Sequence, residues 1–258
     1  MAFVRALVCA ATLPEARAVE RGIRGVVGST LAFEVLRTGM GLRAARRTLE
    51  RELFCRSTDS APHGSSMPDL IISTGFAGTL DAQMVPGSWV LGDHVLLWLN
   101  PPRPGISVIA PGGTVAVDWL KPAADALGAR GSTVLSSPLL VAYDPTLNEV
   151  MSRRQGPVAV DMESAALAEV ARRYGVPFAV LRLVTDTPDQ PLPGFVYGFA
   201  NALSFDARLT VAARARHAAR GAVAVATRPQ DLIRFVQASM DWGKTLESGW
   251  RRIAAGGR

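Results

Sequence analysis

The sequence predicts a single-domain α/β protein, and three observations lead to that prediction. Apolar runs that end at glycine or proline alternate with segments whose apolar residues recur every three to four positions. Several of these runs are continuous stretches of Val, Ile and Leu, as expected for a sheet that is buried on both faces. Of the 258 residues, 48% are hydrophobic and 19% are charged. This balance provides enough apolar surface for a large core and excludes a disordered chain.

The expected elements follow one another in the order of such a fold. Strands are expected at residues 6–11, 31–37, 69–74, 89–97, 114–118, 133–140, 158–161 and 178–185. Helices are expected at residues 15–25, 42–54, 120–128, 164–174, 206–226 and 231–253. Two loops, residues 56–67 and 100–113, are too short to separate domains. We therefore expect one domain over residues 1–258, with a C-terminal helical extension at about residues 206–256.

The last expected helix carries an apolar stripe that includes two tryptophans. Such a stripe usually packs in a core or at a subunit interface, and the alternatives are a helix in peripheral contact with a membrane or a lid over an apolar substrate. No stretch of the chain approaches the ~18–20 unbroken apolar residues of a transmembrane helix, so none is expected. The stripe consists of Leu232, Phe235, Val236, Met240, Trp242, Leu246, Trp250 and Ile253.

Composition excludes several classes of protein. Cys9 and Cys55 are too few for a disulfide scaffold, and the three histidines lie far apart, so no metal site is expected. No G-x-S-x-G motif is present. The apolar stretch after Arg5 is better explained as a buried first strand than as a signal peptide, and we expect a cytoplasmic protein. The net charge is +6, but the basic residues are spread out without interleaved aromatics, so no nucleic-acid partner is expected.

Two glycine-bearing segments follow expected strands. Residues 38–44 read T-G-M-G-L-R-A and fit the pattern G-x-G-x-x-A. This pattern is consistent with a dinucleotide fold, and equally with a helix N-terminus that faces a ribose or an anion. Residues 73–81 read S-T-G-F-A-G-T-L-D. Their glycines permit a ligand to approach the backbone closely, or they simply form a tight turn after the strand.

Acidic residues lie at the ends of two later strands that a short helix connects. Asp161 and Glu163 follow one strand, and Asp186 follows the next. We expect the two strands to be neighbours, so that their acidic ends meet at one edge of the sheet. Asp161 or Glu163 could simply cap the helix. Alternatively, the acids form a sugar-and-base site, in which one carboxylate accepts sugar hydroxyls and another manages a proton on a base.

Together these segments resemble the purine and uridine phosphorylase superfamily. The most similar branch contains 5′-methylthioadenosine/S-adenosylhomocysteine nucleosidase and includes hopanoid-associated phosphorylase-like members. The resemblance implies a three-layer sandwich with a central mixed, partly barrel-like sheet flanked by helices, and a homo-oligomer (a dimer or a trimer of dimers). The matching segments are A-A-T-L-P-E at 10–15, T-G-M-G at 38–41, S-T-G-F-A-G at 73–78, V-D-M-E-S-A-A at 160–166, Y-G-V-P-F at 174–178 and R-L-V-T-D at 182–186.

The resemblance also implies a role for each matching residue. Asp186 would donate a hydrogen bond or proton to N7 of the departing purine, so that the base leaves neutral. Glu163 would accept hydrogen bonds from the ribose 2′ and 3′ hydroxyls, and Met162 would lie beneath the sugar. Glu15 would activate a water molecule, and Arg182 would hold the region of the nucleophile. Further contacts with the substrate are expected from Asp161, Gly75, Phe76, Ala77, Gly78, Thr185 and Gly41.

The chain departs from the family pattern in two places. Phe76 replaces a serine that helps to hold phosphate in the phosphorylases, which favours water as the nucleophile. Residues 144–147, Asp-Pro-Thr-Leu, stand where relatives carry a phenylalanine that stacks on adenine, so the stacking partner is missing or has moved, with Tyr143 as a candidate. The tail is also longer than in the compact nucleosidases. We expect an apolar 5′ substituent to pack against Phe195, Phe199 or the Trp242/Trp250 stripe.

The sequence therefore predicts an enzyme that hydrolyses the N-glycosidic bond of a purine nucleoside with a modified 5′ group. No metal or organic cofactor is expected. The alternative within the same fold is a phosphate-dependent phosphorylase, in which Arg43 or Arg182 binds the anion. A nucleoside-binding protein without turnover is a further alternative. A nicotinamide-dependent dehydrogenase, based on the G-x-G-x-x-A match, is the last.

Overall fold

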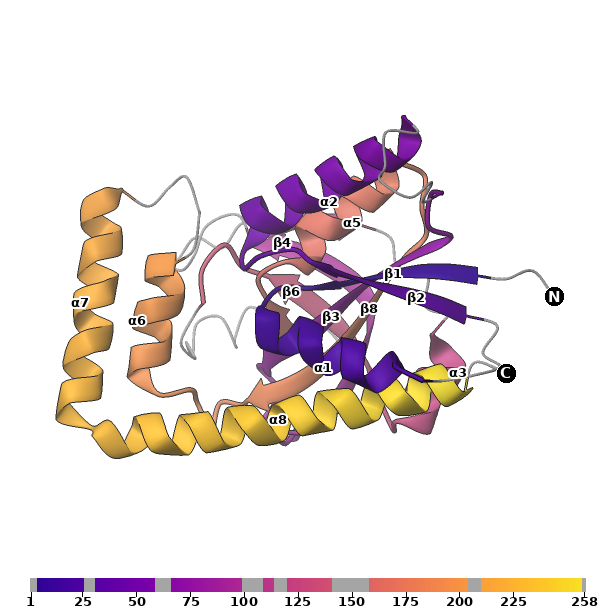
Figure 1. Cartoon of the computed structure of the whole chain (residues 1–258). Helices are drawn as coiled ribbons and strands as arrows, with labels where there is room; N and C mark the ends of the chain where they lie inside the picture. Colours follow the sequence, from indigo (N-terminus) through magenta and orange to yellow (C-terminus); the bar gives the residue numbers. More distant parts are fainter. Residues whose placement is uncertain are drawn as a thin grey trace.

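The computed structural model describes residues 4–25, 31–58, 66–98, 109–113, 120–140, 158–203 and 210–256 (Figure 1). The strands are β1 (Val4–Ala10), β2 (Leu31–Arg37), β3 (Leu70–Thr79), β4 (Trp89–Trp98), β5 (Ile109–Gly113), β6 (Arg130–Ser136), β7 (Val158–Asp161) and β8 (Phe178–Asp186). The helices are α1 (Leu13–Ile23), α2 (Leu42–Ser57), α3 (Lys121–Ala126), α5 (Ser164–Arg173), α6 (Gly194–Leu203), α7 (Val211–Thr227) and α8 (Pro229–Gly256).

The strands of the described part form one mixed, eight-stranded sheet. Its order is β2-β1-β3-β7-β6-β4-β5, and β8 pairs with both β3 and β4. Because β8 joins β3 to β4, the strands β3, β7, β6, β4 and β8 form a closed ring, and β1 and β2 continue from it as an open sheet. Within the ring, β3 runs parallel to β8 and antiparallel to β7. The expected mixed, partly barrel-like sheet is confirmed.

Helices cover both faces of this sheet, as expected for a three-layer sandwich. Helices α2 and α5 pack together over one face, and α1, α3 and α8 lie over the other (Figure 1). Strand β1 contributes to both cores because successive side chains of a strand point to opposite faces. Leu7 and Cys9 join the core beneath α2 and α5, whereas Ala6 and Val8 join the core beneath α1 and α8.

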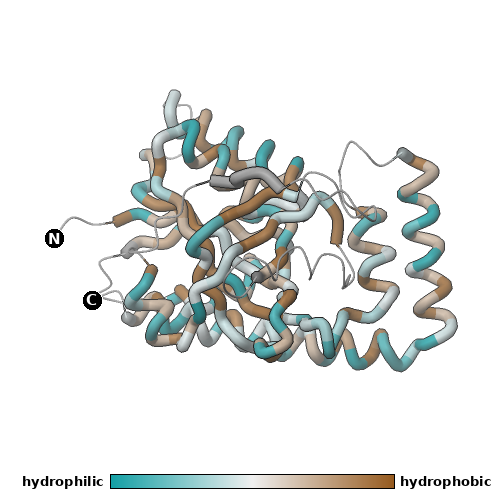
Figure 2. Tube along the Cα trace, turned by 180° about the vertical axis from the view of Figure 1, so that it is seen from behind, coloured by the Kyte–Doolittle hydropathy of each residue, from teal (hydrophilic) through white to brown (hydrophobic). Residues whose placement is uncertain are grey.

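The two halves of α8 have different surroundings. In the C-terminal half, Trp250 is fully buried beneath the sheet, and its Nε1 donates a hydrogen bond to Thr74 Oγ1 at 3.1 Å. The N-terminal half leaves the sheet and lies with α6 and α7 at one end of the molecule (Figure 1). Apolar residues occur along both α7 and this half of α8 (Figure 2). The core assignment of the apolar stripe is therefore confirmed for Leu246, Trp250 and Ile253, whereas Leu232, Val236 and Met240 are exposed.

Three expectations about the elements were wrong. The segment at 194–203 is the helix α6, which its glycine and aromatic content did not predict. Part of an expected loop forms β5, where Pro111 is tolerated because β5 is the last strand in the sheet order. Strands β7 and β8 are not neighbours, because β3 lies between them and its Gly78 pairs with both Val160 and Asp186. The strand expected at 114–118, the start of the helix expected at 206 and the segment containing residues 143–147 lie outside the described residues.

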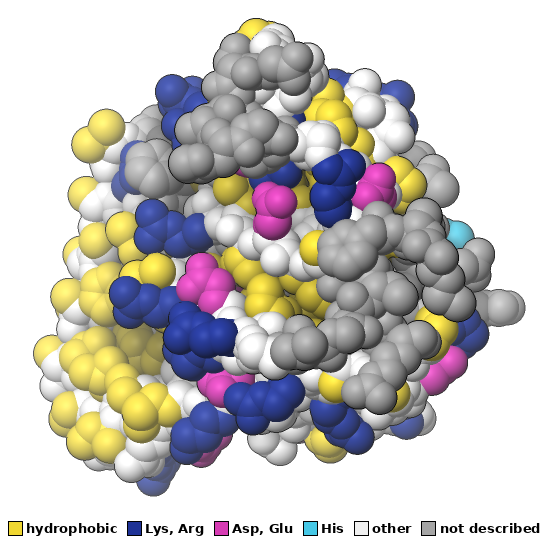
Figure 3. All heavy atoms as spheres, turned by 45° about the vertical axis from the view of Figure 1, so that its right-hand side comes forward, with side chains coloured by type: hydrophobic (Ala, Val, Ile, Leu, Met, Phe, Trp, Pro, Cys, Tyr) yellow, Lys and Arg dark blue, Asp and Glu magenta, His cyan; other side chains and the backbone are white. Residues whose placement is uncertain are grey.

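On the face shown in Figure 3, the described side chains do not form a continuous basic patch. In Figure 3, basic side chains lie next to acidic ones in several places. Ion pairs join Arg21 to Glu247 and Arg46 to Glu169 on helix surfaces, consistent with solvated helix faces. None of the described helices combines the length and the apolar character needed to span a membrane.

Candidate active site

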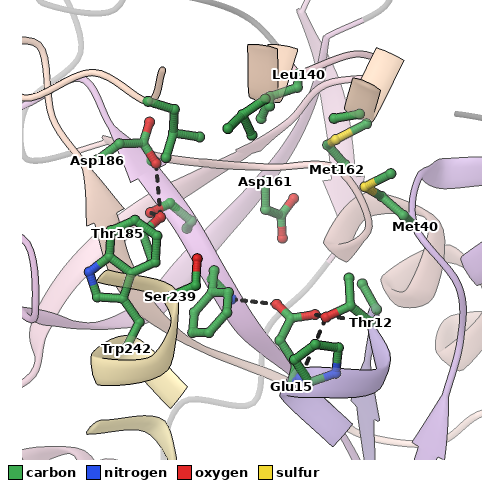
Figure 4. A pocket seen from close by; sticks show the side chains of 18 of the residues that line it. Thr12, Glu15, Met40, Leu140, Asp161, Met162, Thr185, Asp186, Ser239 and Trp242 are labelled. Atoms are coloured by element: carbon green, nitrogen blue, oxygen red, sulfur yellow. Dashed lines mark hydrogen bonds between the residues drawn. The ribbon is translucent and has the colours of Figure 1, made fainter. Parts of the chain in front are cut away.

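A cavity of about 1010 Å³ lies beside the closed ring of strands (Figure 4). Its walls come from the start of α1, the second half of β3, the ends of β7 and β8, α6 and the first half of α8. Most of the lining is apolar, and four carboxyl groups lie among it. The sequence-predicted residues that line the cavity are Glu15, Phe76, Ala77, Gly78, Asp161, Met162, Glu163, Thr185 and Asp186.

The carboxylate of Glu15 is held in place at the start of α1. Thr12 is the N-cap of this helix, and its N–H and its Oγ1 donate to Glu15 Oε2 at 2.8 and 2.6 Å. The Thr12 hydroxyl also accepts the Glu15 backbone N–H, which completes a capping box. On the other side, the Phe76 N–H donates to Glu15 Oε1 at 2.7 Å. Both carboxylate oxygens of a 4%-exposed side chain are therefore fixed by donors.

Asp186 ends β8 on another side of the same cavity (Figure 4). The Thr185 hydroxyl donates to Asp186 Oδ1 at 2.9 Å. The other carboxylate oxygen, Oδ2, lies so close to Gly78 that a Cβ on that glycine would come within 2.7 Å of it. The pairing of β3 with β8 is irregular between Ala77 and Gly78, at the point where Asp186 enters the cavity.

The two glycines of the Gly75–Gly78 segment each make room for one carboxylate. Gly75 has a φ of +127°, and a Cβ there would collide with the Glu15 carboxylate. A Cβ on Gly78 would likewise collide with the Asp186 carboxylate. Of the two alternatives for this segment, the tight turn after residue 74 is wrong, because the strand continues through Thr79. The glycines serve close approach of acidic side chains within a strand rather than a change of chain direction.

Asp161 of the cavity lining forms a buried ion pair with Arg182, which lies behind it. Arg182 Nη2 lies 2.6 Å from Asp161 Oδ2, and the two side chains are 1% and 0% exposed. Arg182 Nη1 donates to the carbonyl oxygen of Thr74 at 2.8 Å, and Ser136 Oγ donates to Asp161 Oδ1 at 2.5 Å. Arg182 was expected to hold the nucleophile, but the structure places it outside the cavity lining, as it does Gly41 and Gly75.

Glu163 connects this buried pair to the cavity. Its Oε1 accepts a hydrogen bond from the Gly41 N–H at 2.8 Å, and its Oε2 lies 3.7 Å from Arg182 Nη2. Gly41 is the N-cap of α2 and has a φ of +92°. The glycine turn at residues 38–41 therefore directs its amide toward a carboxylate of the protein. Met40, between the two glycines, lines the cavity.

Burial raises the pKa of two of the cavity acids. Loss of water raises the pKa of Asp186 to about 6, against a smaller lowering by the Thr185 hydroxyl. Burial also raises the pKa of Glu163 to about 7, opposed by the positive charge of Arg182 and assisted by the negative charge of Asp161. An acid with a pKa of about 6 keeps part of its proton near neutral pH and can donate it to a substrate.

The C-terminal helices add an aromatic wall. The ring of Phe76 packs edge-on against Trp242 of α8, with centroids 6.1 Å apart. Trp242 packs against Phe235 at 6.0 Å, and Phe235 packs against Phe195 of α6 at 5.4 Å. Trp242 and Phe235 line the cavity, so the stripe of α8 does reach it. Phe195, Phe199 and Trp250, which were also expected there, do not line it.

Several residues of this region were not predicted from the sequence. Thr12 was recoverable, because Thr12 and Glu15 have the spacing of a capping box. Tyr197 lines the cavity and Asn201 hydrogen-bonds to its wall, but both belong to α6, which was not expected to be a helix. Within the described ranges, no cluster of three or more His, Cys, Asp or Glu side chains could hold a metal ion.

The fold is shared with solved nucleosidases. A 5′-methylthioadenosine/S-adenosylhomocysteine nucleosidase from Neisseria meningitidis matches 99% of this chain and 98% of its own, with a TM-score of 0.59 at 15% identity. The S-adenosylhomocysteine nucleosidase of Streptococcus pyogenes matches 74% of this chain and 87% of its own, with a TM-score of 0.56 at 16% identity. A mutant futalosine hydrolase from Helicobacter pylori matches 70% and 89%, with a TM-score of 0.52 at 14% identity.

The sequence shows the family directly. The family model described as the phosphorylase superfamily matches residues 3–220, which is most of the chain. The protein belongs to the phosphorylase superfamily, as the motifs at residues 73–78, 160–166 and 182–186 predicted. The match ends within α7, so the whole of α8 lies beyond it.

Proposed function

We propose that the protein hydrolyses the N-glycosidic bond of a purine nucleoside that carries a modified 5′ group. The observation that carries this proposal is the placement of Asp186 and Glu15 in one cavity, each fixed by backbone or hydroxyl donors and each given room by a glycine. Two acids in one cavity suit a reaction in which one group protonates the leaving base and another activates the attacking water.

In the proposed reaction, Asp186 delivers its proton to N7 of the purine as the glycosidic bond breaks. The base leaves neutral, and the bond electrons remain on it. Glu163 accepts hydrogen bonds from the ribose hydroxyls and stabilises the positive charge that develops on the sugar. Glu15 removes a proton from a water molecule, whose oxygen then bonds to the anomeric carbon. The products are free base and free sugar, and no metal or organic cofactor takes part.

The surroundings of Phe76 favour water over phosphate as the nucleophile. Its N–H is already used by Glu15, and its ring packs against Trp242. The rival assignment needs Arg182 or Arg43 to bind phosphate. Arg182 is neutralised by Asp161, and neither Arg182 nor Arg43 lines the cavity. The basic residues of the described part that do line it are Arg17, Arg21 and Lys244, so the two arginines that the phosphorylase alternative names are not placed to bind phosphate there.

The C-terminal helices support a large 5′ group. A volume of about 1010 Å³ is at the upper end of ligand pockets, which usually hold about 300–1,000 Å³. The part contributed by α8 lies beyond the family match and is mainly apolar. We therefore propose that the base and ribose lie between Asp186 and Glu15 and that an apolar 5′ substituent extends along α8. The α8 residues that line the cavity are Phe235, Val236, Ser239, Met240, Trp242, Gly243 and Lys244.

The direct test measures base release from a panel of nucleosides, with and without phosphate, by chromatography. The panel contains methylthioadenosine, adenosine, inosine and an adenosine with a bulky 5′-alkyl group. We expect free base and free sugar in amounts that do not depend on phosphate. Sugar 1-phosphate formed only when phosphate is present would establish the phosphorylase instead. Binding without turnover across the panel would identify a nucleoside-binding protein.

Truncation of Trp242 should lower activity more for a nucleoside with a bulky 5′ group than for one with a small 5′ group. In Trp242→Ala, we expect kcat/KM for the bulky 5′-alkyl adenosine to fall about 10–100-fold, because a buried contact worth about 1.5–3 kcal/mol is lost. Activity on adenosine should change less than threefold. Ile233→Ala on the same helix is the matched control, since Ile233 is 61% exposed and does not line the cavity. Equal losses for both substrates would contradict a contact between α8 and the 5′ group.

A further inference from the structure

Asn201 makes an unusual two-point contact between α6 and the chain after β6. Its Oδ1 accepts a hydrogen bond from the Leu140 N–H at 2.8 Å, and its Nδ2 donates to the Leu140 carbonyl oxygen at 3.0 Å. The side chain is only 6% exposed. One amide side chain therefore satisfies both backbone groups of a single residue 61 positions away.

Both partners of this contact belong to the walls of the cavity. Leu139 and Leu140, after β6, line the cavity, and so do Val196, Tyr197 and Ala200 of α6. Asn201 follows directly after Ala200. The two hydrogen bonds therefore join two segments of the cavity wall.

The other described contacts of α6 lead to the C-terminal helices. Gly198 lies so close to α7 that a Cβ there would come within 2.6 Å of the Gly221 nitrogen. Phe195 packs against Phe235 of α8. Two hydrogen bonds of Asn201 join α6 to the chain after β6, and Tyr197 of α6 hydrogen-bonds to the backbone of Leu192, in the short connection from β8. Without the Asn201 bonds, α6 would be held by that local contact and by α7 and α8.

We propose that Asn201 is a positioning residue that fastens α6 over the Asp186 side of the cavity. The double hydrogen bond to Leu140 holds Tyr197 and Val196 against the bound base and keeps bulk water away from Asp186. This inference rests on the proposed function for its kinetic consequences only. The contact itself can be tested on the protein without substrate.

Closure by α6 has a consequence for proton transfer. The pKa of Asp186 is raised to about 6 mainly because the carboxyl is buried. Thr185 from β8 donates to it, Gly78 of β3 abuts it, and the titratable group that faces it from α6 is Tyr197, whose pKa is raised to about 12 by burial. Tyr197 thus stays neutral across the working range. Release of α6 would hydrate Asp186 and lower its pKa toward the ordinary value.

The test compares Asn201→Ala with the wild type and with Ser132→Ala. The control removes a buried hydroxyl that accepts the Ala159 N–H at 3.2 Å and does not line the cavity. In Asn201→Ala we expect kcat/KM to fall about tenfold, as for the loss of two net hydrogen bonds, mainly through KM. The alkaline limb of its pH profile should move to lower pH. Hydrogen exchange of the peptide containing Leu140 should speed up, while that of β1 stays as in the wild type.

Unchanged exchange at Leu140, or unchanged kinetics and pH profile in an active enzyme, would overturn the proposal. If the wild type releases no base, the proposed function fails, and faster exchange at Leu140 in Asn201→Ala still supports the fastening role. If Asn201→Ala does not fold, Asn201→Asp is measured instead. That variant keeps the acceptor for the Leu140 N–H and loses the donor, so exchange at Leu140 should be intermediate; exchange equal to the wild type would count against the role.

Discussion

Asp186→Asn is expected to lower the rate of base release by about 10²–10⁴-fold, the usual range for loss of a general acid. The amide has nearly the shape of the carboxyl and can still accept the Thr185 hydroxyl, so the cavity should keep its form. The amide has no acidic proton that it can transfer to N7, so the purine would have to leave as an anion. Asp189→Asn, three residues away and exposed, is the matched control and should be indistinguishable from the wild type.

The pH profile gives this prediction a sharper form. The working state needs a protonated Asp186, and this proton is lost as the pH rises through about 6. It also needs an ionised Glu163, whose carboxylate forms as the pH rises through about 7. The two acids lie in one cavity, so the profile of kcat/KM should be a bell whose two limbs belong to the pair, with its maximum near the midpoint of these values, about 6.5. In Asp186→Asn the residual rate should lose the alkaline limb. An unchanged bell in this variant would remove Asp186 from the acid role.

Much of the site could be predicted from the sequence because its residues follow apolar strands. Glu163 and Asp186 each lie directly after a buried run, and such ends converge at a sheet edge. The reason for their convergence was not correctly predicted. The acids do not meet because β7 and β8 are neighbours, but because β3 passes between these strands and pairs through Gly78 with both. Strand order depends on contacts far apart in the sequence, which local apolar patterns do not specify.

The part of the cavity wall that α6 and α8 form was predicted less well, for a related reason. The stripe on α8 was recognised from its spacing, but spacing does not distinguish Trp250 in the core from Trp242 at the cavity. The division arises where α8 leaves the sheet to meet α6 and α7. Helix α6 itself was missed because Gly194 and Gly198 are poor helix formers. Gly198 makes room for the backbone of α7, and this contact between two helices cannot be predicted from the local sequence.

Glu15→Gln separates a catalytic role from a purely structural one. Glu15 completes the capping box of α1. Its side chain would therefore be held in this position even in a protein without any activity. Three donors point at the Glu15 carboxylate: the Thr12 N–H, the Thr12 hydroxyl and the Phe76 N–H. In the variant, the NH2 group of the glutamine must therefore face at least one of these donors and loses that hydrogen bond. We expect a loss of about 0.5–2 kcal/mol of stability from the damaged cap. If Glu15 also activates water, the rate should fall about 10²–10⁴-fold in addition.

Thr12→Ala provides the comparison that decides between these roles. It removes the hydroxyl from the same capping box but leaves the Glu15 carboxylate, which keeps its contact with the Phe76 N–H. Both variants should therefore unfold at similarly lowered temperatures, while only Glu15→Gln loses most of its turnover. Glu20→Gln, exposed on the same helix, controls for the change of charge. Equal losses of turnover in Thr12→Ala and Glu15→Gln would mean that the start of α1 only shapes the cavity, and the base that activates water would have to be sought elsewhere in it.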